Sequence, residues 1–473
     1  MSYQKTTLSR YGGWLPSSRH VHKHFVHKHV ERAHHKIKTH PDGCNAPHHP
    51  AVAKFEKTIE SDPEMKRLFD EIFLQVSKEN KIPNPEAFFH MLDHIIVEPP
   101  KFHIALTDSG EVIGEPIGVP MYLIFDLLCN TCAAYHLFTK PAFNHALKDL
   151  LNTWGHYLST PDSAKTLNED DEGWFSGTSL QTLEDFAGGS FKTTYYCPNP
   201  DAVDKGYKSW DEFFTRKLLP GVRPILAPHD QTLIHSACES TVYRISRKVK
   251  AHDQFWLKGS PYSLYDMLNK DKKMAKEFEG GTVYQAFLSP QDYHRWHAPV
   301  DGVIKKAFRV EGSYYAVLPD AGAEVGDPDL RPGDPHGAII RSQAWMTMHS
   351  ARSLIFIQAD NAEIGLMCFI GVGMAEVSSG EITVKEGQRV KVGDEMGMFH
   401  FGGSSHALVF RPQVEITFAD HVVVDQHLQV NSVIAQVHGG GKSGSGGPEV
   451  PVGRGLPTVA FSASGALGIP MNY

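Results

Sequence analysis

The chain has 473 residues, of which 41% are hydrophobic and 21% charged, a composition typical of a folded protein with two or three domains. The 54 acidic and 46 basic residues give a formal charge of −8, which argues against nucleic acid as the main partner. No apolar run is long enough for a membrane span. Six cysteines in so long a chain are typical of reduced thiols, so the expected location is the cytoplasm.

Residues 1–50 contain ten histidines and show little sustained apolar periodicity. This composition predicts a disordered, solvated arm, with adventitious metal binding as the alternative. Cys129 and Cys132 form a single CxxC, and no second pair completes a zinc site. Two packed core cysteines are therefore favoured, and no metal is expected.

Residues 51–190 carry apolar side chains at helical spacing and are predicted to form a mostly helical domain. A first apolar run, over residues 55–76, is divided by Asp62 and Pro63, which together are typical of a helix start. Further helices are expected over 87–95, 121–138 and 141–158.

Residues 205–437 are predicted to form a β-rich domain, because short alternating runs are separated by Gly, Pro and Asp. Strands are expected over 241–245, 302–308, 353–357 and 381–384. Residues 438–473 are rich in glycine and predict a flexible tail. The expected fold class is thus α+β, with a helical N-terminal region before a β-rich catalytic domain.

Three local segments of the β-rich part carry candidate chemistry. Residues 399–407 contain a Gly-Gly-Ser-Ser step between apolar runs, which taken alone is most often a tight turn. Residues 292–302 hold His294 and His297, for which structural and functional roles are about equally favoured. Residues 236–240 place Glu239 among small side chains, where a surface or capping acid is the simplest interpretation.

Together these segments resemble the phosphatidylserine decarboxylase family. Its members carry a Tyr-His-Arg-x-His-x-Pro segment and, nearer the C-terminus, a Gly-Ser-Thr or Gly-Ser-Ser motif at which the precursor cuts itself. Here the two motifs stand at 293–299 and 403–405. Residues 210–224 are similar to the start of the family's catalytic domain. The resemblance covers about residues 205 to 437, with the motifs in the family's order.

The resemblance implies a pyruvoyl cofactor derived from Ser404. Ser404 would attack the carbonyl of Gly403, and elimination and hydrolysis would leave a large chain of residues 1–403 and a small chain beginning at 404. Serine is a weak nucleophile at neutral pH and needs a base, for which His297 is the candidate. Glu239 is expected to orient His297, as in a serine-protease triad. His294 is the candidate that delivers a proton to the substrate's Cα.

Glu239 also marks a departure from the family's pattern. Where the family usually has Ser-Pro-Ala-Asp-Gly, residues 236–240 read Ser-Ala-Cys-Glu-Ser. A glutamate can orient an imidazole as an aspartate does, but its side chain is one methylene longer. The role of the acid is therefore carried over to Glu239, with a changed loop around it.

The long helical region, with residues 114–123 and 399–405, is similar to a soluble fungal branch of the family, the L-tryptophan decarboxylases. The resemblance implies a carboxy-lyase that acts on a free aromatic L-amino acid, most simply L-tryptophan. Phe401 and Trp296 flank the motifs and are candidate substrate contacts, with a core role as the alternative. Two other functions stay open: a phosphatidylserine decarboxylase that docks through the His-rich arm, and a binding protein that no longer cuts itself.

Overall fold

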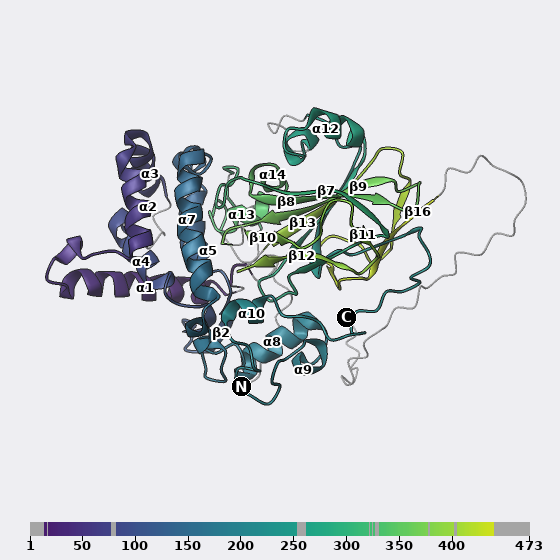
Figure 1. Ribbon diagram of the computed structural model, residues 1–473. Helices are drawn as coiled ribbons and strands as arrows, with labels where there is room; N and C mark the ends of the chain where they lie inside the picture. Colours follow the sequence, from purple (N-terminus) through teal and green to yellow (C-terminus); the bar gives the residue numbers. More distant parts are fainter. Residues whose placement is uncertain are drawn as a thin grey trace, which may run out of the picture. The chain divides into compact units, whose positions relative to one another are not determined.

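The computed structural model describes residues 14–16, 18–76, 82–252, 262–320, 322–323, 325–326, 331–376, 379–401 and 404–438. These residues belong to one compact unit that ends at His438. Helices dominate its N-terminal part and antiparallel sheets its C-terminal part, which confirms the α+β class (Figure 1). The predicted tail after 438 lies outside the described residues.

Proline and short polar caps start most helices of the N-terminal part. Asp62 caps α3 through the N–H groups of Glu64 and Met65, and Asn84 caps α4 through Ala87. The helices predicted over 55–76, 87–95 and 141–158 are confirmed. The bounds are α2 (Pro50–Ser61), α3 (Pro63–Gln75), α4 (Pro85–Ile95), α5 (Pro120–Cys129), α6 (Cys132–Phe138), α7 (Pro141–Leu158), η2 (Pro161–Thr166), α8 (Gly177–Ala187), α9 (Phe191–Thr194) and α10 (Trp210–Phe214).

The prediction of a disordered arm over residues 1–50 is wrong for its described part, which forms α1 (Arg19–Thr39) and η1 (Gly43–Asn45). One face of α1 is buried, and it carries Val21, Phe25, Val26 and Val30 at helical spacing. Two histidines, at positions 22 and 29, lie on the same buried face. Neutral imidazole is compatible with burial, so the His-rich sequence hides an amphipathic helix.

Two further features of the helical part differ from prediction. Residues Lys101–Leu106 (β1) and Val112–Ile117 (β2) form an antiparallel hairpin where no strand was expected. The helix predicted over 121–138 is broken between Cys129 and Cys132. Of this CxxC pair, Cys129 is buried in the core and Cys132, at the start of α6, is exposed, so the prediction of two packed core cysteines is wrong for Cys132.

The β-rich part is built on an eight-stranded antiparallel sheet with the order β11-β7-β8-β9-β13-β5-β4-β15. Two three-stranded sheets, β10-β12-β6 and β14-β16-β3, accompany it. The strands are β3 (Leu233–His235), β4 (Ser240–Arg247), β5 (Thr282–Leu288), β6 (Arg295–His297), β7 (Gly302–Val310), β8 (Arg352–Ala359), β9 (Leu366–Gly373), β10 (Ser379–Ile382), β11 (Arg389–Val390), β12 (Glu395–His400), β13 (Ser404–Phe410), β14 (Ile416–Phe418), β15 (His427–Leu428) and β16 (Val433–Val437). Short helices α11 (Leu264–Met267), α12 (Lys272–Phe278), α13 (Ala338–Arg341) and α14 (Gln343–His349) lie between them in sequence.

The large sheet separates two apolar cores. Alternating residues of β13 contribute to each, with Ala407 and Val409 in one and Leu408 and Phe410 in the other. The first core also contains most buried residues of the N-terminal helices. The helical region and the sheet therefore share an interior, and β13 is a central, fully buried strand.

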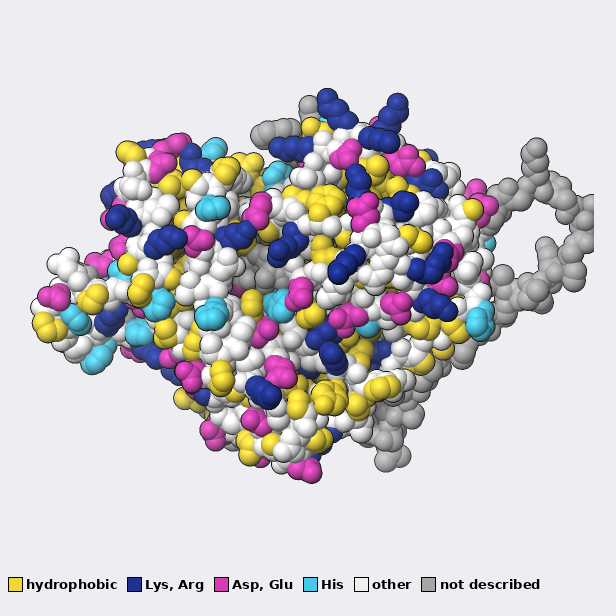
Figure 2. All heavy atoms as spheres, in the orientation of Figure 1, with side chains coloured by type: hydrophobic (Ala, Val, Ile, Leu, Met, Phe, Trp, Pro, Cys, Tyr) yellow, Lys and Arg dark blue, Asp and Glu magenta, His cyan; other side chains and the backbone are white. Residues whose placement is uncertain are grey.

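The surface carries both signs of charge. On the face drawn in Figure 2, Lys and Arg side chains are interspersed with Asp and Glu. This face presents no extended basic patch of the kind that nucleic acid requires. Among the described residues, no helix combines the length and apolar character needed to cross a bilayer.

Candidate active site

The site is centred on Ser404, the first residue of β13. Ser404 pairs with Gly373 of β9 on one side and with Leu288 of β5 on the other, and it is fully buried. Within the described part of the chain its hydroxyl oxygen has no hydrogen-bond partner. A buried hydroxyl is normally satisfied. Those of Ser179 and Ser350 also have no described partner, and Ser404 differs from them in heading a central strand. Gly403, the predicted cleavage partner, lies outside the described residues.

His297 lies at the end of β6 with both ring nitrogens engaged. Its Nδ1 is 2.6 Å from the carbonyl oxygen of Gly393, to which it must donate. Its Nε2 therefore carries the lone pair, and it lies 2.9 Å from the Tyr293 hydroxyl. Burial lowers the pKa of His297, which favours the neutral imidazole that a general base requires.

Glu239 is not hydrogen-bonded to His297, so the predicted acid–imidazole contact is replaced by another. The carboxylate of Glu239 accepts two hydrogen bonds from Arg223, at 2.6 and 3.1 Å. The group that orients His297 is instead the Gly393 carbonyl. The extra methylene of Glu239 and the bidentate preference of a guanidinium explain the change of partner.

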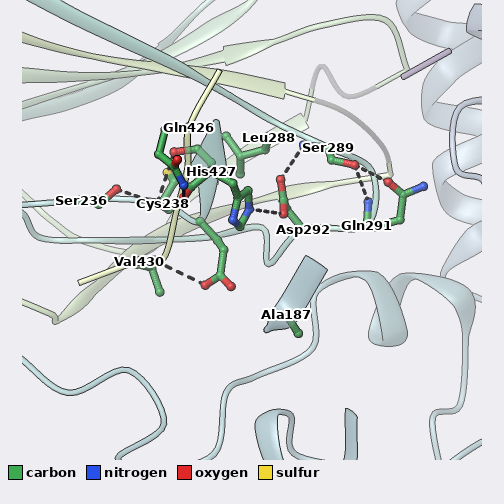
Figure 3. A network of polar contacts seen from close by, with 12 residues as sticks. Ala187, Ser236, Cys238, Leu288, Ser289, Gln291, Asp292, Gln426, His427 and Val430 are labelled. Atoms are coloured by element: carbon green, nitrogen blue, oxygen red, sulfur yellow. Dashed lines mark hydrogen bonds and ion pairs between the residues drawn. The ribbon is translucent and has the colours of Figure 1, made fainter. Parts of the chain in front are cut away.

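An acid–imidazole pair that the sequence did not reveal lies near Glu239 and Arg223, and Figure 3 draws its two members. Asp292, which directly precedes the Tyr-His-Arg motif, is 2.9 Å from Nε2 of His427. Asp292 is buried and accepts the N–H of Ser289. Burial of His427 lowers its pKa, but the contact with Asp292 outweighs this and raises the pKa. The loop that holds Asp292 follows β5, whose last residue, Leu288, pairs with Ser404. Asp292 and His427 are 135 positions apart, and no local pattern singles out His427.

His294 lies in the loop between β5 and β6 and is completely buried. Its ring stacks on Phe214 of α10, with 4.0 Å between ring centroids. Its carbonyl oxygen accepts the N–H of Phe399, which fixes the loop against β12. The predicted start of the catalytic domain, which contains α10, thus supports one of the two motif histidines.

A cavity of about 330 Å³ lies beside the Ser404 strand. It is bordered by α7, by the ends of β7, β8 and β9, and by the turn before β13. The residues that line it are Lys148, Leu151, Asn152, Arg309, Val310, Glu311, Tyr314, Ala351, Arg352, Ser353, Gly371, Gly373, Glu376, Gly380 and Phe401. Because Gly373 pairs with Ser404 and Gly371 with His406, the cavity adjoins the candidate nucleophile. Its volume falls in the range of small-molecule sites.

The two predicted substrate contacts differ in their positions. Phe401 lines the cavity, with a left-handed φ of 74°, and its ring packs against Gly155 so closely that a Cβ there would lie 2.5 Å from it. Trp296 packs behind the cavity wall. A Cβ on Gly371 or Gly380 would lie 3.1 or 3.0 Å from the Trp296 ring, so this indole supports the wall from the core side.

Lys148 and Glu311 form an ion pair of 2.6 Å at the cavity, and Arg352, Glu376 and Arg309 complete its charged lining. Arg352 is buried and donates to three backbone carbonyls, and burial lowers its pKa to about 10. Glu376 accepts the N–H of Tyr122, and burial raises its pKa to about 7. Arg309 is exposed and forms no ion pair with any described residue. The cavity therefore offers an available cation and an acid close to its titration point.

The arrangement defines a class of protein. A buried serine heads a central strand, a buried imidazole, His406, follows two residues along that strand, and a cavity lies beside it. Such a site is suited to cutting its own backbone and to holding a small substrate. Two family models, both described as phosphatidylserine decarboxylase, match residues 210–436 and 49–183.

Three relatives extend this match. A decarboxylase named iboD from Amanita muscaria is 56% identical over 348 residues, which cover 74% of this chain and 99% of the relative. An L-tryptophan decarboxylase from Psilocybe cubensis is 36% identical over 84% of this chain and 88% of its own length. Phosphatidylserine decarboxylase proenzyme 3 from Schizosaccharomyces pombe is 34% identical over 44% of this chain and 19% of its own.

The chain belongs to the phosphatidylserine decarboxylase family, in the same branch as the fungal L-tryptophan decarboxylases. It is a carboxy-lyase, and family members depend on a pyruvoyl group derived from a serine. The buried Ser404 hydroxyl at a strand end fits the origin of such a group. Relatives named proenzymes imply two chains cut from one precursor.

Proposed function

We propose that the chain decarboxylates a free amino acid, after cutting itself between Gly403 and Ser404. The observation that carries this proposal is the unpartnered, buried hydroxyl of Ser404 on a strand whose neighbour, Gly373, lines a cavity of about 330 Å³. A cavity of this size encloses a whole amino acid. The cleavage position itself rests on the sequence motif and on the family.

In this proposal Ser404 is the nucleophile of self-cleavage and His297 the base. The Gly393 carbonyl holds the His297 tautomer whose Nε2 can accept the serine proton. Glu239, which is bound to Arg223, is a positioning residue rather than the direct partner of His297. A pyruvoyl group derived from Ser404 would supply an electron-withdrawing carbonyl for the decarboxylation. His294 delivers the proton to Cα.

Arg309 is the candidate group that attracts the substrate carboxylate to the cavity. Its guanidinium is exposed at the cavity and has no carboxylate partner among the described residues. A cation at the entrance raises the local concentration of anionic groups. The buried Arg352 cannot serve in the same way, because its donors are already bound to backbone carbonyls.

L-tryptophan is the first substrate to test. Two Psilocybe relatives, 36% and 34% identical, are named L-tryptophan decarboxylases, and the Phe401 ring lines the cavity. A smaller amino acid with a polar side chain is the second candidate, because much of the lining is polar. Asn152 and Ser353 offer hydrogen bonds that an indole leaves largely unmet, whereas Lys148 and Glu311 already pair with each other at 2.6 Å.

We further propose that the two chains of the cut precursor remain together and act in the cytoplasm. The described cysteines, at positions 129, 132, 197, 238 and 368, are all free thiols. Free thiols in this number are typical of a reducing compartment. Fluorescence of a tagged chain in fungal cells checks the location, and accumulation in the secretory pathway contradicts it.

Intact-protein mass spectrometry combined with a carbon dioxide assay tests the proposed function. We expect two fragments separated at 403/404, the smaller with a blocked N-terminus, and release of carbon dioxide from L-tryptophan or from a polar amino acid. An Arg309→Gln variant should raise KM about tenfold or more, while the fragments stay the same. An uncut, folded wild type contradicts the mechanism, and turnover of phosphatidylserine vesicles alone contradicts the free amino acid.

A further inference from the structure

A cluster of metal-ligating side chains lies away from the active site, where α1 meets α5. His22 of α1, Asp126 of α5 and His336, which precedes α13, each place one ligand-type atom within 4.8 Å of the others. His22 and Asp126 are buried, and the His336 side chain is 10% exposed. Imidazole nitrogens and a carboxylate oxygen form a donor set typical of zinc.

Each histidine already has its second ring nitrogen fixed from outside the cluster. Nε2 of His22 lies 2.7 Å from the Leu123 carbonyl oxygen and must donate to it. Nδ1 of His336 donates to the carboxylate of Asp334. The lone pairs are therefore left on Nδ1 of His22 and Nε2 of His336. A carbonyl or carboxylate behind the imidazole is the arrangement found around metal-bound histidines.

The carboxylate of Asp126 lacks a cation at ion-pair distance among the described residues. Its oxygens accept the hydroxyl of Tyr122 at 2.9 Å and the N–H of Gly337 at 3.1 Å. Buried carboxylates are normally paired with a cation or bound to a metal.

A second cluster with the same residue types shows the contrast. His48, His90 and Asp93 also lie within ligand distance of one another. There, however, the ammonium of Lys36 is 2.8 Å from Asp93 and supplies the cation that the carboxylate needs. Charge is thus balanced by a side chain in one cluster and is left unbalanced in the other.

We propose that His22, Asp126 and His336 bind one divalent zinc ion, with water as the fourth ligand. The ion would tie α1 to α5 and to the segment before α13, three elements that are far apart in sequence. Its role would be structural, because the cluster shares no residue with the Ser404 cavity. Zinc binding requires side-chain adjustments that bring the three atoms, now within 4.8 Å of one another, to bonds of about 2 Å.

Metal analysis of the full chain, expressed with zinc and dialysed against a weak chelator, tests this site. We expect about one zinc ion per chain, and a d–d absorption spectrum of tetrahedral cobalt after exchange. His22→Gln and His336→Gln should each lose at least nine-tenths of the metal, since glutamine can still donate to Leu123 or Asp334 but ligates zinc poorly. His27→Gln, on the exposed face of the same helix, is the matched control and should keep it.

Thermal unfolding gives a second readout that does not depend on the variants folding equally well. A strong chelator should lower the Tm of the wild type and of His27→Gln, and leave that of His336→Gln unchanged. A wild type with far less than one zinc ion per chain overturns the proposal. Equal metal content in wild type and both cluster variants overturns it as well, because the zinc would then be held by other histidines.

Discussion

Ser404 and Ser405 are adjacent, both buried and on the same strand, yet their surroundings differ. Ser405 faces the core shared with the helices, where its hydroxyl oxygen accepts a hydrogen bond of 2.9 Å from Gln285. Gln285 in turn accepts one from Tyr262 at 2.6 Å. Ser404 faces the opposite core and its hydroxyl has no described partner. Because adjacent strand residues face opposite sides of the sheet, the Ser405 hydroxyl is held by a hydrogen bond and the Ser404 hydroxyl is available.

Replacing each serine in turn gives the largest expected difference. Ser404→Ala should abolish cutting completely, because the attacking oxygen is removed. Ser405→Ala should still be cut, since its hydroxyl serves packing and hydrogen bonding. Denaturing electrophoresis after expression measures both. If Ser405→Ala is uncut and Ser404→Ala is cut, the nucleophile is Ser405 and not Ser404.

A base variant should have the next largest effect. His297→Gln is expected to slow cutting by about 10²–10⁴-fold, the usual contribution of a general base. Tyr293→Phe removes the hydroxyl that occupies Nε2 and should leave cutting within a few-fold of wild type. Time courses of cutting in a cell-free translation reaction compare the two. Equal rates for His297→Gln and wild type would rule out His297 and direct attention to the Asp292–His427 pair.

On the Ser405 side, an effect on stability without an effect on cutting is expected. Gln285→Leu removes the partner of both Ser405 and Tyr262, and should reduce the free energy of unfolding by about 1–3 kcal/mol. The final fraction of chains that are cut should not change. Urea unfolding in the uncut Ser404→Ala background measures the loss. A Gln285→Leu chain that is stable but uncut would show that the two sides are coupled.

His406 lies on the same face of the sheet as Ser404, and its burial makes the stability of the folded chain depend on pH. Burial lowers its pKa to about 3, against about 6.5 in the unfolded chain. The unfolded state therefore binds the proton more readily, and stability falls as the pH drops below about 6.5, by about 2 kcal/mol between pH 7 and 5. His406→Phe, in surroundings that already hold Phe369 and Tyr284, should remove this share of the acid sensitivity. Identical pH profiles for the two chains would contradict the assignment.

Much of the fold could be predicted because its signals are local. Apolar periodicity and Asp62-Pro63 locate α3, and alternating runs locate β4, β7 and β8. Helix α1 was missed since a sequence pattern does not tell a neutral, packed histidine from a charged, solvated one. The α1 histidines at positions 22 and 29 have pKa values lowered to about 3 and 4 by burial.

The site residues likewise divide into those with a local sequence signal and those without one. The Gly-Ser-Ser motif singles out Ser404, and nearby Phe401, a candidate substrate contact, lines the cavity. The partner of Glu239 could not be predicted, because Arg223 and His297 both lie in quoted motifs and only geometry chooses between them. The Asp292–His427 pair joins two distant parts of the chain and has no sequence signature.

The central position of β13 has a consequence for the life of the protein after cutting. The segment 404–438 supplies β13 between β9 and β5, β15 beside β4, and β16, which pairs with β3 on one side and with β14 of the same segment on the other. A cut at its first residue leaves two polypeptides interwoven through three sites, so neither can depart without dismantling the sheet. Before cutting, refolding is a unimolecular event; afterwards it requires two molecules to meet. We therefore expect the uncut precursor to refold readily, and the cut enzyme, once unfolded, to refold poorly.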